Sequence, residues 1–133
     1  MLKKILKISF LLFIVILLNS CEIEKTDVTG VYVAENLINN IDTLKVLENG
    51  TYSKVLYRKS DNSLVYKNTG KWDFKDGRII LYDFFLDEDQ VYSKEAGDFE
   101  NVLITSSFTV GRRLNKIVIH YMQLTDYKYY EKQ

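Results

Sequence analysis

The chain has 133 residues, enough for one small domain, and its 18 Lys and Arg balance its 18 Asp and Glu. This balance gives no reason to expect nucleic acid as a partner. One Cys and one His cannot supply a structural zinc site or a disulfide within one chain, so we predict no metal and no other cofactor.

Residues 1–20 have the layout of a bacterial secretory signal. Three lysines precede an unbroken apolar run over residues 10–18. This run is much shorter than the roughly 20 residues that a membrane-spanning helix needs. We therefore expect residues 1–20 to be a signal peptide that is cleaved.

The signal ends in Leu18-Asn19-Ser20-Cys21, which resembles the lipobox of bacterial lipoproteins. The resemblance implies that Cys21 is diacylated on sulfur and becomes the first residue of the mature protein. The alternative is an ordinary signal peptide followed by a free thiol, which is a liability in an oxidising compartment. Cleavage leaves a net charge of about −3, which favours neither nucleic acid nor an anionic membrane face.

These features predict a protein of the cell envelope, anchored to the outer membrane by lipid on either its periplasmic or its surface side. Residues 22–29 are polar, so we interpret residues 21–29 as the lipidated cysteine and a tether.

From residue 30 onward Tyr, Val, Ile, Thr and Phe dominate, and helical spacing of apolar residues is hard to find. Turn pairs divide this region into strands, and Asn-Gly and Asp-Gly are the strongest hairpin signals. The pairs are Asn39-Asn40, Asn49-Gly50, Asp61-Asn62 and Asp76-Gly77. The first five strands are predicted over about 30–37, 42–48, 51–59, 64–74 and 78–86.

An acidic stretch over residues 87–101 predicts a long loop. Three more strands are expected after it: one over residues 102–110, one that contains Ile117, Ile119 and Tyr121, and a short one over residues 127–130, with a basic turn at residues 111–116. Eight antiparallel strands in a meander leave two sheet edges, and closure removes both. We predict one all-β domain over residues 30–133, a lipocalin-like barrel, with a curled half-barrel as the alternative.

Five short segments look like those of the small lipocalin-like lipoproteins of Gram-negative bacteria, a family mostly without assigned function. They are Gly30-Val31-Tyr32, Asp42-Thr43-Leu44, Asn49-Gly50-Thr51-Tyr52, Gly70-Lys71-Trp72 and Arg78-Ile79-Ile80-Leu81. The resemblance implies a barrel fold more than a role. The partner we expect for such a module is a small apolar ligand or an envelope protein. True lipocalins open their first strand with Gly-x-Trp, whereas this chain has Tyr32 there and a Gly-x-Trp only at residues 70–72.

The sequence does not predict an enzyme. Its one imidazole, His120, lies in a strand pattern typical of a structural residue, and no nucleophile elbow, phosphate loop or dinucleotide motif occurs. A carboxylate pair for glycoside hydrolysis stays open in principle. Asp87, Glu88 and Asp89 do not have the spacing of a calcium loop.

The predicted function is therefore a lipid-anchored binding or interaction module. The alternatives are an inhibitor or immunity-type lipoprotein and an accessory subunit of an outer-membrane assembly, both acting through loops. The candidate lumen or ligand residues are Tyr32, Tyr66, Trp72, Phe74 and Phe108. The candidate partner residues are Asp87, Glu88, Asp89, Arg112 and Arg113.

Overall fold

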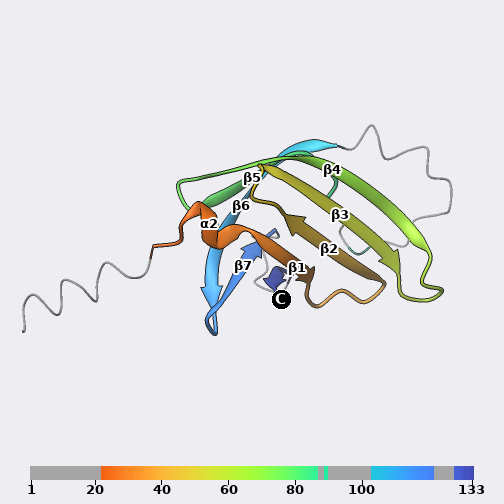
Figure 1. Cartoon of the computed structure of the whole chain (residues 1–133). Coiled ribbons are helices and arrows are strands. Elements are labelled where there is room, and N and C mark those ends of the chain that lie inside the picture. The colour runs from red at the N-terminus through yellow and green to blue at the C-terminus, as the bar shows by residue number, and fades with distance from the viewer. Residues whose placement is uncertain (1–21, 87–88, 90–102, 122–127) are drawn as a thin grey trace, which may run out of the picture.

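The structure, a computed structural model, describes residues 22–86, 89, 103–121 and 128–133. Within these ranges a single short helix precedes eight strands (Figure 1). The elements are α2 (Lys25–Val28), β1 (Gly30–Ala34), β2 (Asn40–Val46), β3 (Thr51–Arg58), β4 (Leu64–Lys75), β5 (Arg78–Phe84), β6 (Ile104–Arg113), β7 (Lys116–His120) and β8 (Tyr130–Lys132).

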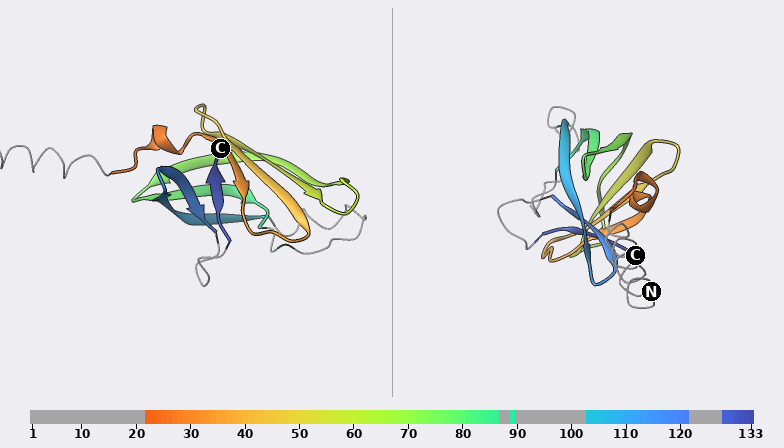
Figure 2. Two further views of the ribbon diagram at one scale, coloured as in Figure 1. Left: turned by 90° about the horizontal axis from the view of Figure 1, so that it is seen from below. Right: turned by 90° about the vertical axis from the view of Figure 1, so that its left-hand side faces the viewer.

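The eight strands form a closed barrel. Each strand pairs antiparallel with the next one along the chain, and β8 pairs with both β7 and β1 to close the wall (Figures 1 and 2). The predicted all-β meander is thus confirmed, and the wall closes rather than ending as a half-barrel. Closure gives each strand two neighbours in the strand order, although β4 pairs with β5 only over residues 72–75. It therefore reduces the strand edge that is open to edge-to-edge association.

Alternating burial shows which face of each strand points inward. Every second residue of β2 is buried, and β3 buries Tyr52, Lys54 and Leu56 in the same way. The apolar core includes Tyr32, Leu44, Val46, Tyr52, Trp72, Ile79, Leu81, Phe84, Phe108, Val110, Ile117, Ile119, Tyr121 and Tyr130. Because aromatic rings bury large areas, they dominate the stabilisation of this interior.

Local turn chemistry explains the hairpins. Asp76 and Gly77 both have positive φ and make the two-residue turn that was predicted between β4 and β5. Asn49-Gly50 differs, since only Gly50 has positive φ and the turn spans residues 47–50, closed by the Gly50 N–H on the Leu47 carbonyl at 3.2 Å. The predicted basic turn at residues 111–116 is shorter, because β6 runs to Arg113 and only residues 114 and 115 turn.

Several predicted boundaries differ from the structure. Strand β1 ends at Ala34 rather than at residue 37, and Asn40, placed in a turn, is the buried first residue of β2. The last strand covers residues 130–132 instead of 127–130, and Tyr127 lies outside the described residues. Most of the predicted loop over residues 87–101 also lies outside them.

Residues 23–28, expected to be part of a tether, pack on one end of the barrel. Val28 is fully buried, and Ile23 packs against the core. The Val28 carbonyl accepts a hydrogen bond from the Tyr32 hydroxyl at 2.5 Å, and the Glu24 N–H donates to the Asp27 carboxylate to cap α2. Any tether before the barrel is therefore shorter than the sequence suggests.

Strand β5 contains a bulge where it leaves β4. Leu81 of β5 pairs with Ser106 of β6, and the next paired residue of β5, Phe84, pairs with Ile104. Three steps along β5 thus match two along β6, and Asp83, within this bulge, has a φ of 53°. The Tyr52 hydroxyl lies 2.8 Å from the Tyr82 carbonyl, and the Asn68 side-chain amide donates to the Asp83 carbonyl at 2.8 Å. Side chains of β3 and β4 thus satisfy carbonyls that the bulge takes out of the ladder.

Among the buried tyrosines, the phenols of Tyr32 and Tyr52 make the barrel sensitive to alkali. Burial raises the pKa of both above the usual value, helped by the Asp27 charge for Tyr32 and by Tyr66 and Asp83 for Tyr52. Since the folded-state pKa is the higher one, their contribution to stability is complete below pH ~10 and is lost above it.

We expect the free energy of unfolding to fall by about 1.4 kcal/mol per pH unit for each buried phenol above pH ~10, as measured by urea denaturation. Tyr32→Phe should reduce this slope. Tyr82→Phe, at an exposed ring, is the matched control and should leave the slope unchanged. Equal slopes in both variants would contradict the assignment.

Candidate functional site

Asp42, Lys54 and Tyr130 form a charged cluster in the interior of the barrel. All three side chains are essentially inaccessible to solvent. The Lys54 ammonium donates to the Asp42 carboxylate and to the Tyr130 hydroxyl, the latter at 2.5 Å, and the Tyr130 hydroxyl donates to Asp42 Oδ2 at 2.5 Å. The ammonium also lies 4.8 Å from the centre of the Phe84 ring. This cluster joins three strands, β2, β3 and β8, by charge-assisted hydrogen bonds.

A small residue on β1 lies between the two strands that Tyr130 and Asp42 connect. Tyr130 pairs with Ala34 of β1, which stands between β8 and β2 in the barrel. Since alanine has only a methyl group, we infer that the phenol passes over it to Asp42. The second oxygen of this carboxylate, Oδ1, is buried and has no hydrogen-bond partner among the described residues.

The five candidate lumen residues all lie on strand positions that face inward. Tyr32, Trp72 and Phe108 are buried, whereas Tyr66 and Phe74 are half-buried. Aromatic rings contact one another in the interior. Phe84 meets Tyr52 and Phe108 edge to face at centroid distances of 5.9 and 5.6 Å, and the ring centroids of Tyr66 and Phe85 are 4.8 Å apart. These contacts favour an interior packed with the chain's own side chains along this region of the barrel.

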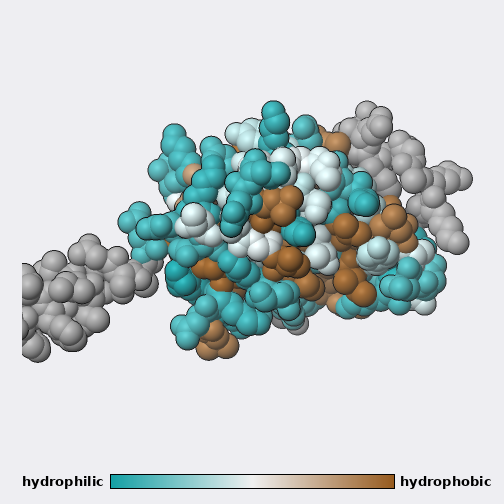
Figure 3. Space-filling model, in the orientation of Figure 1, coloured by the Kyte–Doolittle hydropathy of each residue, from teal (hydrophilic) through white to brown (hydrophobic). Residues whose placement is uncertain are grey.

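An apolar surface lies on the outside of β2–β4 at the end away from α2. Ile41, Tyr57 and Leu64 pair across three neighbouring strands and are 40%, 38% and 54% exposed. Beside them, Ile38 in the β1–β2 loop is 81% exposed. We call Ile38, Ile41, Tyr57 and Leu64 the distal face. Figure 3 shows hydrophobic surface gathered over β2 and β3 toward this end.

Polar groups border the distal face. A surface pocket of about 320 Å³ adjoins Ile38 and is also lined by Asn39, Arg58, Lys59 and Ser60. The Lys59 ammonium donates to the Leu37 carbonyl at 2.6 Å, which holds the β1–β2 loop against the end of β3. Apolar residues with a polar border are the composition of a protein interface.

Asp89, a candidate partner residue, is used within the chain. It is buried, and its carboxylate accepts backbone N–H bonds from Ile38, Asn39 and Asn40 at 2.6, 2.9 and 3.0 Å. Its own backbone carbonyl accepts the Asn39 side-chain amide. These bonds fix the chain at residue 89 next to the distal face, while Asp87 and Glu88 lie outside the described residues.

Arg112 and Arg113 lie at the opposite end, in β6. Both are exposed. Arg112 forms an ion pair with Asp27 of α2 at 3.4 Å, and the Arg113 guanidinium lies 5.0 Å from the Tyr129 ring. The structure therefore does not bring the two groups of predicted partner residues together.

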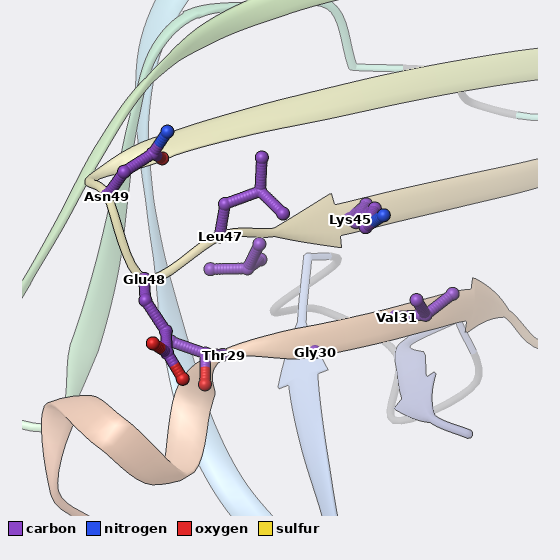
Figure 4. A pocket seen from close by; sticks show the side chains of 8 residues that line it. Thr29, Gly30, Val31, Lys45, Leu47, Glu48 and Asn49 are labelled. Atoms are coloured by element: carbon purple, nitrogen blue, oxygen red, sulfur yellow. The ribbon is translucent and has the colours of Figure 1, made fainter.

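A second pocket, of about 460 Å³, lies beside the start of β1 and the β2–β3 turn (Figure 4). It is shallow, and its lining includes one cation, Lys45, and one anion, Glu48. Mixed charge and wide exposure give it no preference for a ligand class, so we assign it none.

The residues that the structure describes include one histidine and no cysteine. His120 is half-buried, and its ring lies 6.2 Å from that of Tyr129. Within residues 22–86, 89, 103–121 and 128–133, no three His, Cys, Asp or Glu side chains group in a way that could hold a metal. Over the same ranges, no helix is long and apolar enough to cross a membrane. Cys21 lies outside the described residues.

The buried cluster and the distal face were both missed from the sequence. Lys54 shares a strand face with Tyr52 and Leu56, and this mixture of a charged residue with apolar ones does not indicate which face of β3 points inward. The sequence signal that could have indicated the buried cluster is Asp42, a carboxylate at an inward position of the preceding strand.

Comparison with known proteins adds no relative: no family model, no curated protein and no solved structure matches this chain.

Proposed function

We propose that this protein is a lipid-anchored, lipocalin-like module of the cell envelope that docks a protein partner through its distal face. The observation that carries the proposal is the exposed row of Ile41, Tyr57 and Leu64, beside Ile38 and a polar border. Singly exposed apolar residues are ordinary, but a row across three strands has the layout of an interaction site.

The position of this row supports a protein rather than a lipid as its partner. The chain enters the barrel at the α2 end (Figure 1), so an acyl chain on Cys21 would hold that end toward the membrane. The distal face then points away from the bilayer. Asp89 is bonded next to this face, which also supports the inhibitor-type variant of the proposal, in which residues 87–101 add to the contact.

The family resemblance gains one supporting detail. Trp72, in Gly70-Lys71-Trp72, lies at the α2 end of the barrel, where its ring is 5.2 Å from the Lys25 ammonium and its indole N–H donates to the Leu47 carbonyl at 2.7 Å. An indole at a barrel end matches what Gly-x-Trp implies in lipocalins, although it comes from β4 here.

In-cell photocrosslinking tests the docking proposal. A photoreactive phenylalanine analogue in place of Tyr57 should give a discrete protein adduct, because this ring lies in the distal face. The same analogue in place of Tyr82, which is 40% exposed on β5, is the matched control and should give none. Ile41→Lys should abolish the Tyr57 adduct, since a charge would then have to be desolvated in the interface.

Adducts of equal yield at both positions, or an adduct that survives Ile41→Lys, would refute docking at the distal face.

The same cells test the lipid anchor. The chain should sediment with membranes, and Cys21→Ser should release it.

A ligand in the lumen is the second candidate function, and the unpartnered Asp42 Oδ1 is the observation that favours it. Native mass spectrometry of the protein purified from the envelope distinguishes the two candidates. A bound mass of a few hundred daltons that is lost on denaturation would favour the lumen ligand, whereas a bound mass of protein size would favour docking.

A further inference from the structure

The tip of the β6–β7 hairpin carries the most exposed large apolar residue of the described chain. Leu114 is 92% exposed, and Figure 3 shows this tip as an isolated hydrophobic projection. Leu114 and Asn115 have φ values of 47° and 67°, which make the turn a two-residue hairpin of the primed type.

Leucine is an unfavourable choice at this position for two reasons. A bulky side chain is strained at positive φ, where Asn, Asp or Gly is preferred, as in the Asp76-Gly77 turn of the same barrel. Its nearly complete exposure also means that packing within the described chain does not offset this strain. A strained residue without a folding benefit points to a role outside the fold.

Cations surround the tip. Arg112 and Arg113 precede Leu114, and Lys116 follows it. The nearby carboxylates are Asp27, 3.4 Å from Arg112, and Glu131, 2.6 Å from Lys116, while Arg113 lies against the Tyr129 ring. When Lys132, which donates to the Asp27 carbonyl, and Glu35, whose charge also acts on Lys116, are counted, four cations face three anions, so the hairpin keeps a small positive excess.

The hairpin lies at the end of the barrel where the chain enters. In Figure 1 its tip projects at the same end as α2, and the Arg112–Asp27 ion pair joins the two elements. Lys132 strengthens this junction by donating to the Asp27 carbonyl at 2.8 Å. The start of the described chain, which follows Cys21, and the β6–β7 hairpin therefore lie at the same end of the barrel.

We propose that the β6–β7 hairpin is a bilayer contact, with Leu114 in the interfacial region and the flanking cations near anionic headgroups. An apolar tip with a basic border suits such a surface. The inference rests on the proposed anchoring through Cys21 and adds an orientation, because two contacts at one end hold the barrel upright with its distal face outward.

The test uses the mature lipidated protein in nanodiscs that contain about one third anionic phospholipid and a trace of lipid with a nitroxide headgroup. Nuclear magnetic resonance then reports how close each backbone amide lies to the headgroups. Amides of residues 113–116 should lose intensity, and those of residues 61–63, in the β3–β4 turn at the other end, should not. Neutral phospholipid should weaken the effect.

Leu114→Asn separates membrane contact from folding. Asparagine suits the positive φ, so the melting temperature should rise or stay unchanged, while the equilibrium constant for hairpin docking should fall about tenfold on loss of the buried leucine side chain. Leu64→Asn, in the distal face, is the control and should leave the signals of residues 113–116 as they are.

Three results would overturn the inference. If residues 113–116 keep full intensity on discs that carry the protein, the hairpin does not dock, although the anchor stands. If Leu114→Asn leaves their signal loss unchanged, Leu114 does not mediate the contact. If the protein fails to associate with the discs, the anchoring proposal fails, and this inference fails with it.

Discussion

Replacing Lys54 by Met should lower the free energy of unfolding by about 3–5 kcal/mol, measured by urea denaturation at neutral pH. The substitution keeps most of the side-chain volume but leaves the Asp42 carboxylate inside the barrel without its cation. It also removes the donor that lies 2.5 Å from the Tyr130 hydroxyl. A loss of this size is a large fraction of the total stability of a typical domain.

Two further variants separate charge from packing. Lys45→Met, at an exposed outward position on β2, is the matched control and should change stability by less than about 0.5 kcal/mol. The triple variant Asp42→Leu, Lys54→Met, Tyr130→Phe removes every polar group of the cluster and should recover most of the loss. If Lys54→Met alone is neutral, the cluster is not a closed ion pair in solution.

Gly70→Ala should destabilise the barrel by about 1–3 kcal/mol, the usual range for overpacking. A β-carbon at this position would lie 2.5 Å from Cε1 of Tyr52 and 2.5 Å from the Tyr82 carbonyl oxygen. The ring cannot move away easily, because its hydroxyl is bonded at the β5 bulge.

Gly111→Ala is the control for Gly70→Ala, measured in the same denaturation experiment. A β-carbon there meets nothing closer than 3.5 Å, so alanine should be neutral or should stabilise the strand. Equal effects of the two substitutions would show that the close approach at Gly70 does not govern its cost.

The sequence predicted this fold well because its signals are local. Strand residues in alternation, separated by pairs such as Asp76-Gly77, define hairpins, and consecutive hairpins leave few ways to arrange a sheet. Gly70 carries a local signal too: a glycine on an apolar strand face often marks a bend or a close approach, and the Tyr52 ring lies there.

The features that could not be predicted depend on distant residues. The Lys54 side chain can point inward because the Asp42 carboxylate neutralises its charge and the Tyr130 hydroxyl accepts a hydrogen bond from its ammonium. Tyr130 is far away along the chain. Asp89 has the composition of a solvated acidic loop, yet three backbone N–H groups of the β1–β2 loop make its burial favourable. Periodicity along one strand contains no information about either arrangement.

The three-residue strand β8 has a consequence for how the protein folds. It pairs Tyr130 with Ala34 and with Ile119, so the last seam of the wall joins residues about 100 positions apart. This seam cannot form until residues 130–132 are in place beside β1. Closure of the wall should therefore be a late and comparatively slow folding event, and the unclosed intermediate, with the facing edges of β1 and β7 unpaired at the gap, is the species most prone to aggregation.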